Sequence, residues 1–249
     1  MKILAIETSA RAASCGWWED GKLLAEYFSH AGLTHSQTIM PMVQSMLEQT
    51  GRAPGEADYF AVSQGPGSFT GLRIGIAAVK GLAMALQKPC VPVSTLHHLA
   101  WNAACFSGYI LPVMDARCNQ FYAAIFESRD AQVHRICPDE AMAAEELADR
   151  IAALDAPVML VGDGAKLLRE RMDAQPGHFS QAACANTGRE RPAISPETGL
   201  YQRAGSLCLA AQQAIAAGQT CSAQELAPAY LRLPQAQREL LARRQKEQT

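Results

Sequence analysis

Short apolar runs alternate with polar turns in the first thirty residues. Residues 3–6 read ILAI and predict a buried strand. Residues 13–18 and 22–28 predict two further strands, and the Asp20–Gly21 pair between them is typical of a two-residue hairpin turn. We therefore expect the chain to open with a meander of three strands.

The next apolar positions recur at helical spacing and predict a helix over residues 35–50. Thr34 is suited to cap the start of this helix, and Gly51 is suited to end it. A short strand is predicted over residues 59–63. A glycine-rich loop, QGPGSFTG, then leads into a second helix over residues 72–86.

A strand over residues 90–94 and a helix from residue 96 to about 105 complete this half, and the pattern restarts after Ser107. The second half predicts strands over 109–114, 120–127, 132–136 and 158–161, helices over 141–154 and 196–217, a loop-rich stretch over 174–198 and a charged tail from Arg238. Each half has a strand ending in an acidic residue, two more strands, then helix and strand. This order predicts an α/β fold of two halves, 1–107 and 108–249, with mixed sheets and covering helices.

The composition of the 249 residues narrows the class of protein. A hydrophobic fraction of 49% excludes a disordered chain, and a net charge of −2 excludes a chain that binds nucleic acid by charge over its whole surface. None of the eight cysteines forms a CxxC pair. The N-terminus lacks the apolar block of a signal peptide, and the longest apolar stretch is broken by Lys80. We expect a cytoplasmic protein with reduced thiols and no membrane segment.

Three turns have the form of phosphate-binding turns. They contain Glu7 and Ser9 after the first strand, Asp115 at the matching place in the second half, and Asp163 between two glycines. Backbone N–H groups in such turns hold phosphate oxygens, and a carboxylate there holds a metal ion. The alternative is that acidic residues at strand ends simply form turns.

The glycine-rich loop, residues 65–71, also has two interpretations. It provides an anion site at a helix N-terminus, or it is a tight turn that fixes how the helix packs. In either case Ser68 or Thr70 is suited to cap the helix.

The two predicted helices of the first half carry few charges. On the second helix, Arg73, Ala77, Lys80 and Met84 share one face, and Met42 and Met46 lie in a wide apolar arc of the first. These six residues are the predicted partner interface. The alternative is that both helices are buried within their own domain.

Histidine spacing argues against a metal site. His97 and His98 are adjacent and diverge by roughly 100° on a helix. The sequence contains no HExxH or HxxxH pair, and no serine or cysteine lies in a GxSxG elbow.

Several motifs together resemble the TsaB (YeaZ) family. They are ILAIETS at the N-terminus, VSQGPGSFTGLRIGIAAVKGLA over 62–83, PVSTL over 92–96, MDAR over 114–117 and PAYLR over 228–232. The resemblance implies two duplicated halves of the actin, hexokinase and Hsp70 (ASKHA) fold. It also implies a partner protein in forming the threonylcarbamoyl modification of adenosine in tRNA, working with the paralogous transferase TsaD and the ATPase TsaE.

The resemblance further implies that this chain is not itself an enzyme. The paralogue holds a metal with an HxxxH pair, and the corresponding places here carry Thr95 and Leu99. The turn at Glu7 lacks the expected glycine, and Arg117 is bulky where a phosphate would approach. The expected role is a non-catalytic scaffold without metal or tightly bound cofactor.

Expected partners are the TsaD-type paralogue, the TsaE-type ATPase and, when the chain is alone, a second copy of itself. ATP or ADP is expected only at a subunit junction, and tRNA is expected to bind only through the complex. Two rival functions remain open. An active small-molecule kinase or ATPase of the same fold is favoured by Asp115 and Asp163, whereas a metalloprotease is opposed by the missing histidine pair.

Overall fold

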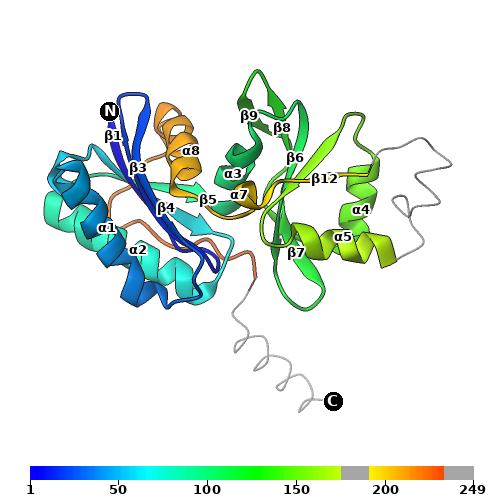
Figure 1. The fold of residues 1–249 in the computed structure, drawn as a ribbon, viewed down its shortest axis with the longest axis horizontal. Coiled ribbons are helices and arrows are strands. Elements are labelled where there is room, and N and C mark those ends of the chain that lie inside the picture. Colours follow the sequence, from blue (N-terminus) through cyan, green and yellow to red (C-terminus); the bar gives the residue numbers. More distant parts are fainter. Residues whose placement is uncertain (175–190, 233–249) are drawn as a thin grey trace, which may run out of the picture.

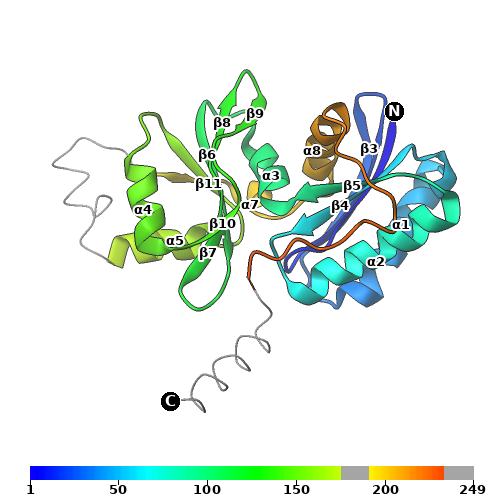
Figure 2. The same ribbon diagram turned by 180° about the vertical axis from the view of Figure 1, so that it is seen from behind.

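The computed structural model describes residues 1–174 and 191–232. Within them the chain forms two β-sheets that lie side by side, each covered by helices (Figures 1 and 2). Most of the loop predicted over 174–198 and all of the tail from Arg238 lie outside the described residues.

The first sheet contains the three predicted N-terminal strands and two later ones, in the order β3-β2-β1-β4-β5. Their bounds are β1 (Lys2–Glu7), β2 (Ala13–Glu19), β3 (Lys22–Ser29), β4 (Tyr59–Gly65) and β5 (Cys90–Ser94). Strands β1 to β3 form the expected antiparallel meander, and β4 and β5 run parallel to β1. Asp20 and Gly21 have φ angles of 46° and 86°, as a tight hairpin turn requires.

Helices cover both faces of this sheet, so β1 is buried on both sides. Leu4 and Ile6 face α1 (His35–Thr50) and α2 (Phe69–Leu86), whereas Ile3 and Ala5 face α8 (Ala204–Ala216). Because successive residues of a strand point to opposite faces, a strand covered on both sides is apolar throughout. This explains the uninterrupted ILAI run.

The second sheet has the order β10-β7-β6-β11-β12, and a hairpin of β8 and β9 is attached to β6. The bounds are β6 (Gly108–Asp115), β7 (Gln120–Ala123), β8 (Phe126–Arg129), β9 (Gln132–Arg135), β10 (Glu140–Ala143), β11 (Val158–Val161) and β12 (Ala193–Ile194). Helices α4 (Ala144–Ala152) and α5 (Ala165–Ala174) cover one face, and α3 (Thr95–Ala100) packs on the other.

In each sheet the first strand of the half lies in the middle, with antiparallel strand pairs on one side and parallel strand pairs on the other. The predicted α/β class with mixed sheets and covering helices is confirmed, and duplication of the halves stays a prediction. The ranges 1–107 and 108–249 also stay a prediction, and some elements pack across the boundary between them. Helix α3 packs on the second sheet, whereas α8 and residues 221–232 return to the first (Figure 2).

Several predicted helices were wrong in their bounds. Residues 140–143 pair with β7 as strand β10, so α4 begins only at Ala144. The helix predicted over 196–217 is divided into α7 (Glu197–Leu200) and α8. Helix α3 ends at Ala100 and continues as a 3-10 turn, Trp101–Ala103, and a similar turn covers Pro54–Glu56.

Helix α2 begins three residues before its predicted start. Its 18 residues make it long and apolar enough to cross a membrane by length and composition, which the shorter prediction had excluded. In this fold α2 packs on the first sheet, and Leu72, Ile76 and Val79 are buried there.

Candidate functional site

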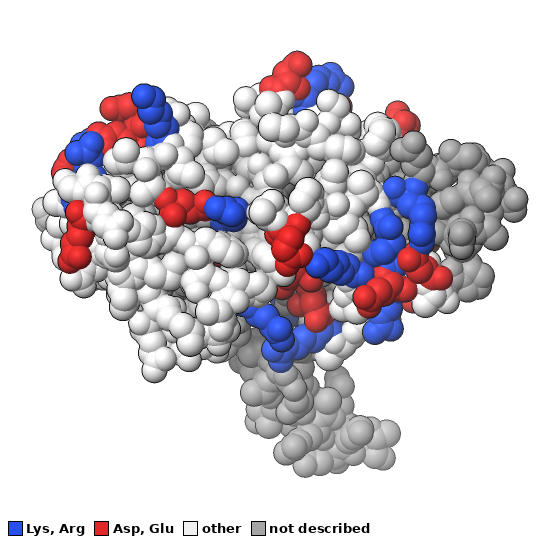
Figure 3. Space-filling model, viewed as in Figure 1, with Lys and Arg blue, Asp and Glu red and all other residues white. Residues whose placement is uncertain are grey.

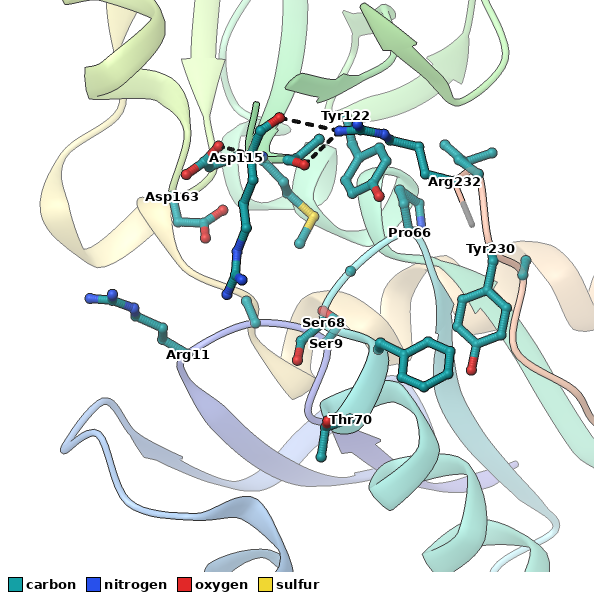
Figure 4. Close-up of a pocket in the computed structure, with 18 residues that line it drawn as sticks. Ser9, Arg11, Pro66, Ser68, Thr70, Asp115, Tyr122, Asp163, Tyr230 and Arg232 are labelled. Atoms are coloured by element: carbon teal, nitrogen blue, oxygen red, sulfur yellow. Dashed lines mark hydrogen bonds between the residues drawn. The ribbon is translucent and has the colours of Figure 1, made fainter. Parts of the chain in front are cut away.

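A cavity of about 560 Å³ lies between the two sheets. Residues 9–11 and 66–70 line it from the first sheet, and residues 114–117, Tyr122 and Asp163 line it from the second. The C-terminal residues 229–232 complete its wall (Figure 4). The cavity thus brings together Ser9, Asp115 and Asp163, three of the four residues predicted to form phosphate-type turns.

The fourth residue, Glu7, does not line the cavity. Its carboxylate is buried, with Oε1 accepting the Ser9 N–H at 2.5 Å and Oε2 lying 2.8 Å from Nε2 of His98. Ser63 also donates a hydrogen bond to this carboxylate. The Ser9 N–H that a phosphate would need is therefore occupied from inside the protein. The glutamate side chain, which is longer than that of aspartate, reaches Ser63 and His98 and forms a buried polar network with them.

The turn after β6 is closed in the same way. Oδ1 of Asp115 accepts the N–H of Arg117 at 2.7 Å. Residues 117–119 have φ angles between 53° and 60°, the left-handed conformation. In both halves the acidic residue at the end of the first strand thus binds the N–H two residues further on. Neither of these two N–H groups faces a ligand.

Asp163 lies in the cavity wall on the turn between β11 and α5. Its side chain keeps exposed area, yet the surrounding walls remove much of the bulk water, and this desolvation raises its pKa to about 6. The nearby Asp115 charge raises the pKa further, whereas the Asp163 backbone N–H, Gln202 and Arg11 lower it. The protonation of Asp163 therefore changes at about pH 6.

The glycine-rich loop packs against the turn after β1. A Cβ atom at Gly67 would collide with the carbonyl oxygen of Ser9, and one at Gly71 with that of Thr8. The Ser68 N–H donates to the Ser9 carbonyl at 2.7 Å, and Ser68 Oγ caps α2 by accepting the Gly71 N–H. These contacts agree with the packing interpretation of the loop. Of the two predicted cap residues, Ser68 and Thr70, it is Ser68 that caps the helix.

The turn of residues 162–164 makes the equivalent contacts in the second half. A Cβ atom at Gly162 would collide with the Val113 carbonyl oxygen, and one at Gly164 would lie 2.9 Å from the Asp115 nitrogen. In the first half the glycine loop thus packs against the turn after β1, and in the second half the glycine turn packs against the last residues of β6. The resemblance between these two loops is not visible in the sequence, because they share only their glycines.

The C-terminal segment 229–232 joins the two halves at the mouth of the cavity. The Ala229 N–H donates to the Gln64 carbonyl, and the Tyr230 ring stacks on Phe69 at 4.9 Å between centroids. Arg232 donates to the carbonyl oxygens of Ala116 and Arg117 on the other side. The PAYLR motif does not predict this role, because neighbouring residues in the sequence do not show where the segment packs.

Half of the predicted interface residues are exposed on the outer face of α2. Arg73, Ala77 and Met84 lie there, which rules out the interpretation that Ala77 belongs to the domain core. Figure 3 shows few charged side chains on the surface over α1. Met40 on α1 adds an exposed methionine to this surface, which we call the α1–α2 face.

The other three interface residues need correction. Met46 is completely buried, with its sulfur 3.9 Å from Cys15 Sγ, so it belongs to the core and not to an interface. Met42 is half-buried against the same core. The Lys80 ammonium donates to the Gln224 carbonyl of the C-terminal segment. The wide apolar arc of α1 arises because β2, β3 and α2 all contact it.

The positions that correspond to metal ligands in the paralogue are in the core. Thr95 and Leu99 are completely buried. Among residues 1–174 and 191–232, no group of three or more His, Cys, Asp or Glu side chains is arranged to hold a metal ion. Burial, with the nearby Arg135 charge, lowers the pKa of His97 to about 4, so this imidazole is neutral at physiological pH.

Comparison with known proteins identifies the family of this chain. The family model described as "TsaD: tRNA N6-adenosine threonylcarbamoyltransferase" matches residues 29–240. The chain is 31% identical to the tRNA threonylcarbamoyladenosine biosynthesis protein TsaB of Escherichia coli, over 93% of this chain and 95% of that protein. The chain belongs to the TsaB family. It is also 32% identical to TsaB of Bacillus subtilis, over 70% of this chain and 76% of that protein.

A solved structure agrees with this family. The structure of YeaZ from Pseudomonas aeruginosa has a TM-score of 0.76 and 28% sequence identity, covering 92% of this chain and 99% of that one. The predicted family and its fold are therefore confirmed.

Proposed function

We propose that this chain acts in the biosynthesis of threonylcarbamoyladenosine in tRNA as a non-catalytic subunit that supports a TsaD-type transferase. Membership of the TsaB family supports the pathway. The observation that carries the non-catalytic role is the closure of both acidic turns. Glu7 and Asp115 bind their own backbone N–H groups, which leaves those groups unable to stabilise a developing phosphoryl charge.

The α1–α2 face is the proposed docking surface for the transferase. Arg73 and Lys80 are the charged side chains within one turn of Ala77 on α2, and the apolar side chains of Met40 and Met84 are 40% and 55% exposed. Exposed apolar area of this kind is typical of surfaces that a partner covers. The same face is proposed to join two copies of this chain when the transferase is absent. We further propose that a TsaE-type ATPase joins the complex and that ATP or ADP binds at a subunit junction. Transfer RNA would bind only through the complex, and the complex would be cytoplasmic.

A reconstitution experiment tests the proposal. The full chain is mixed with the paralogue, the ATPase and threonylcarbamoyl-adenylate, and tRNA modification is measured with and without this chain. We expect modification to require the chain, and we expect Ala77→Glu to weaken both co-purification and modification. Ala216→Glu, at an exposed alanine of α8, is the matched control and should leave both unchanged. Full modification without this chain would contradict the supporting role.

The rival kinase or ATPase function is favoured by one observation, the presence of Asp115 and Asp163 together in the cavity. It predicts ATP turnover by the isolated chain that is lost in Asp163→Asn. We expect no turnover, because a phosphate chain would find the Ser9 and Arg117 N–H groups already bound.

A further inference from the structure

The cavity between the sheets has no part in the proposed function. Its volume of about 560 Å³ is typical of small-molecule sites, and polar groups converge on it from both halves. The wall formed by the first half contains a buried polar atom without a partner among the described residues. Ser9 is completely buried there, and its Oγ atom has no hydrogen-bond partner within residues 1–174 and 191–232. A buried hydroxyl without a partner is costly, and a ligand in the cavity would satisfy it.

The same wall carries the N-terminal end of α2. Ser68 caps the Gly71 N–H, and the Leu72 N–H binds the Ser68 carbonyl. The N–H groups of Phe69 and Thr70, at the first two helical positions, have no intrahelical acceptor, and both residues line the cavity. An anionic group is favoured at this place by the N–H groups and by the dipole of an 18-residue helix.

The opposite wall is acidic. Figure 4 shows Asp115 and Asp163 together on the side of the cavity that faces Ser9 and Ser68. The two carboxylates repel each other, as the effect of Asp115 on Asp163 shows. Among the described residues neither makes a salt bridge, so a cationic group between them would relieve this repulsion.

The two walls therefore favour opposite charges at the two ends of one ligand. We infer that the cavity binds a small zwitterion, a free α-amino acid, with its carboxylate at the N-terminal end of α2 and its ammonium group between Asp115 and Asp163. Arg11 and Arg117 line the same cavity, and neither forms a salt bridge within the described parts of the chain. Arg11 lies near enough to Asp163 to lower its pKa, so the acidic wall is partly balanced by this guanidinium.

Ligands with one kind of charge fit this cavity less well. Inorganic phosphate would meet the two carboxylates, and a small cation would leave the Ser9 hydroxyl and the end of α2 without an acceptor. Binding should therefore require both the ammonium group and the carboxylate of the ligand. Analogues that lack one of these groups test this requirement directly.

Binding to the purified full chain is measured by isothermal titration, first with L-threonine and then with the other common amino acids. L-threonine comes first because the modification named for the family contains a threonyl group. N-acetyl-L-threonine lacks the ammonium charge, L-threonine methyl ester lacks the carboxylate, and inorganic phosphate serves as the anion alone. We expect saturable binding of at least one amino acid below about 10 mM, and at least ~10-fold weaker binding of the analogues that lack one charge.

Two variants locate the ligand. Asp163→Asn and Ser9→Ala are each expected to weaken binding by ~10-fold or more, whereas Asp130→Asn in an exposed turn should not change it. Circular dichroism confirms that each variant is folded. No saturable binding of any amino acid would overturn the inference, as would equal binding of N-acetyl-L-threonine or phosphate. The assay contains no transferase and no tRNA, so its result is independent of the proposed function.

Discussion

The Glu7 carboxylate lies 2.8 Å from Nε2 of His98, and both side chains are completely buried. Ser63 bonds to both of them, so the end of β1, the middle of β4 and helix α3 are tied together below the turn after β1. This arrangement explains why an acidic residue lies at the end of β1. The Glu7 carboxylate does not bind phosphate there, because it interacts with Ser63 and His98.

Removing the Glu7 carboxylate should destabilise the protein. In Glu7→Ala, the imidazole of His98 and the hydroxyl of Ser63 lose their buried acceptor, and we expect a loss of about 3–5 kcal/mol in the free energy of unfolding. Urea denaturation followed by circular dichroism measures it. Glu48→Ala, at an exposed position of α1, is the control and should change stability by less than about 0.5 kcal/mol. A Glu7→Ala protein as stable as the control would show that the network contributes nothing.

Substitutions on the exposed side of α2 and on the buried side of α1 should differ in their effects on stability. Ala77→Glu places a charge on an exposed position, so its melting temperature should stay close to that of the unmodified chain. Met46→Ala opens a cavity in the core between α1 and β2 and should cost about 2–5 kcal/mol. Thermal melts of the two variants compare these positions directly. An unfolded Ala77→Glu protein would mean that this face is covered within the chain itself.

The cavity predicts a specific dependence of stability on pH. The pKa of Asp163 is about 6 in the folded chain, above its ordinary value of 3.8, so the folded state binds the proton more tightly. Stability from this group is full below pH 3.8 and is lost as the pH rises through 6. Asp163→Asn should therefore raise the free energy of unfolding at pH 8, by about 1 kcal/mol because cavity water screens the charge, and by less at pH 5.

Urea titrations at the two pH values test this, with Asp130→Asn as the control. An Asp163→Asn variant that is less stable than the unmodified chain at pH 8 would show that the carboxylate has a stabilising partner there.

Arg232 should hold the C-terminal segment to the second half. Its guanidinium bonds to two backbone carbonyls, and hydrogen bonds from a charged group contribute about 1.5–3 kcal/mol. Arg232→Ala should speed amide hydrogen exchange in residues 226–232, while Arg129→Ala, in an exposed ion pair, should not. Unchanged exchange in Arg232→Ala would indicate that Tyr230 and Ala229 alone hold the segment.

Local patterns were enough for much of the fold and for part of the site. The Asp20–Gly21 turn, the helix ending at Gly51 and the cap at Ser68 depend on neighbouring residues, and each was predicted correctly. The buried state of Met46 and the strand at residues 140–143 depend on packing with distant elements. Helical spacing on one element does not contain that information.

The site shows the same division. Asp115 and Asp163 were recognised as turn residues, and they do meet in the cavity. Glu7 was expected in a phosphate-type turn, but it forms a buried network instead. The sequence does not show this, because its partners Ser63 and His98 are 56 and 91 positions away along the chain. The role of Arg232 was missed because it depends on where the segment crosses between the halves.

The return of α8 and residues 221–232 to the first sheet has a consequence for synthesis of the chain. When the ribosome has released residues 1–107, the strands of the first sheet are present, but Ile3, Ala5, Ala61 and Val91 still lack the helix that covers them. That apolar face stays open to water, or to a chaperone, until α8 (Ala204–Ala216) has emerged. The first half of this protein is thus completed last, and premature termination would leave an aggregation-prone fragment in place of a stable domain.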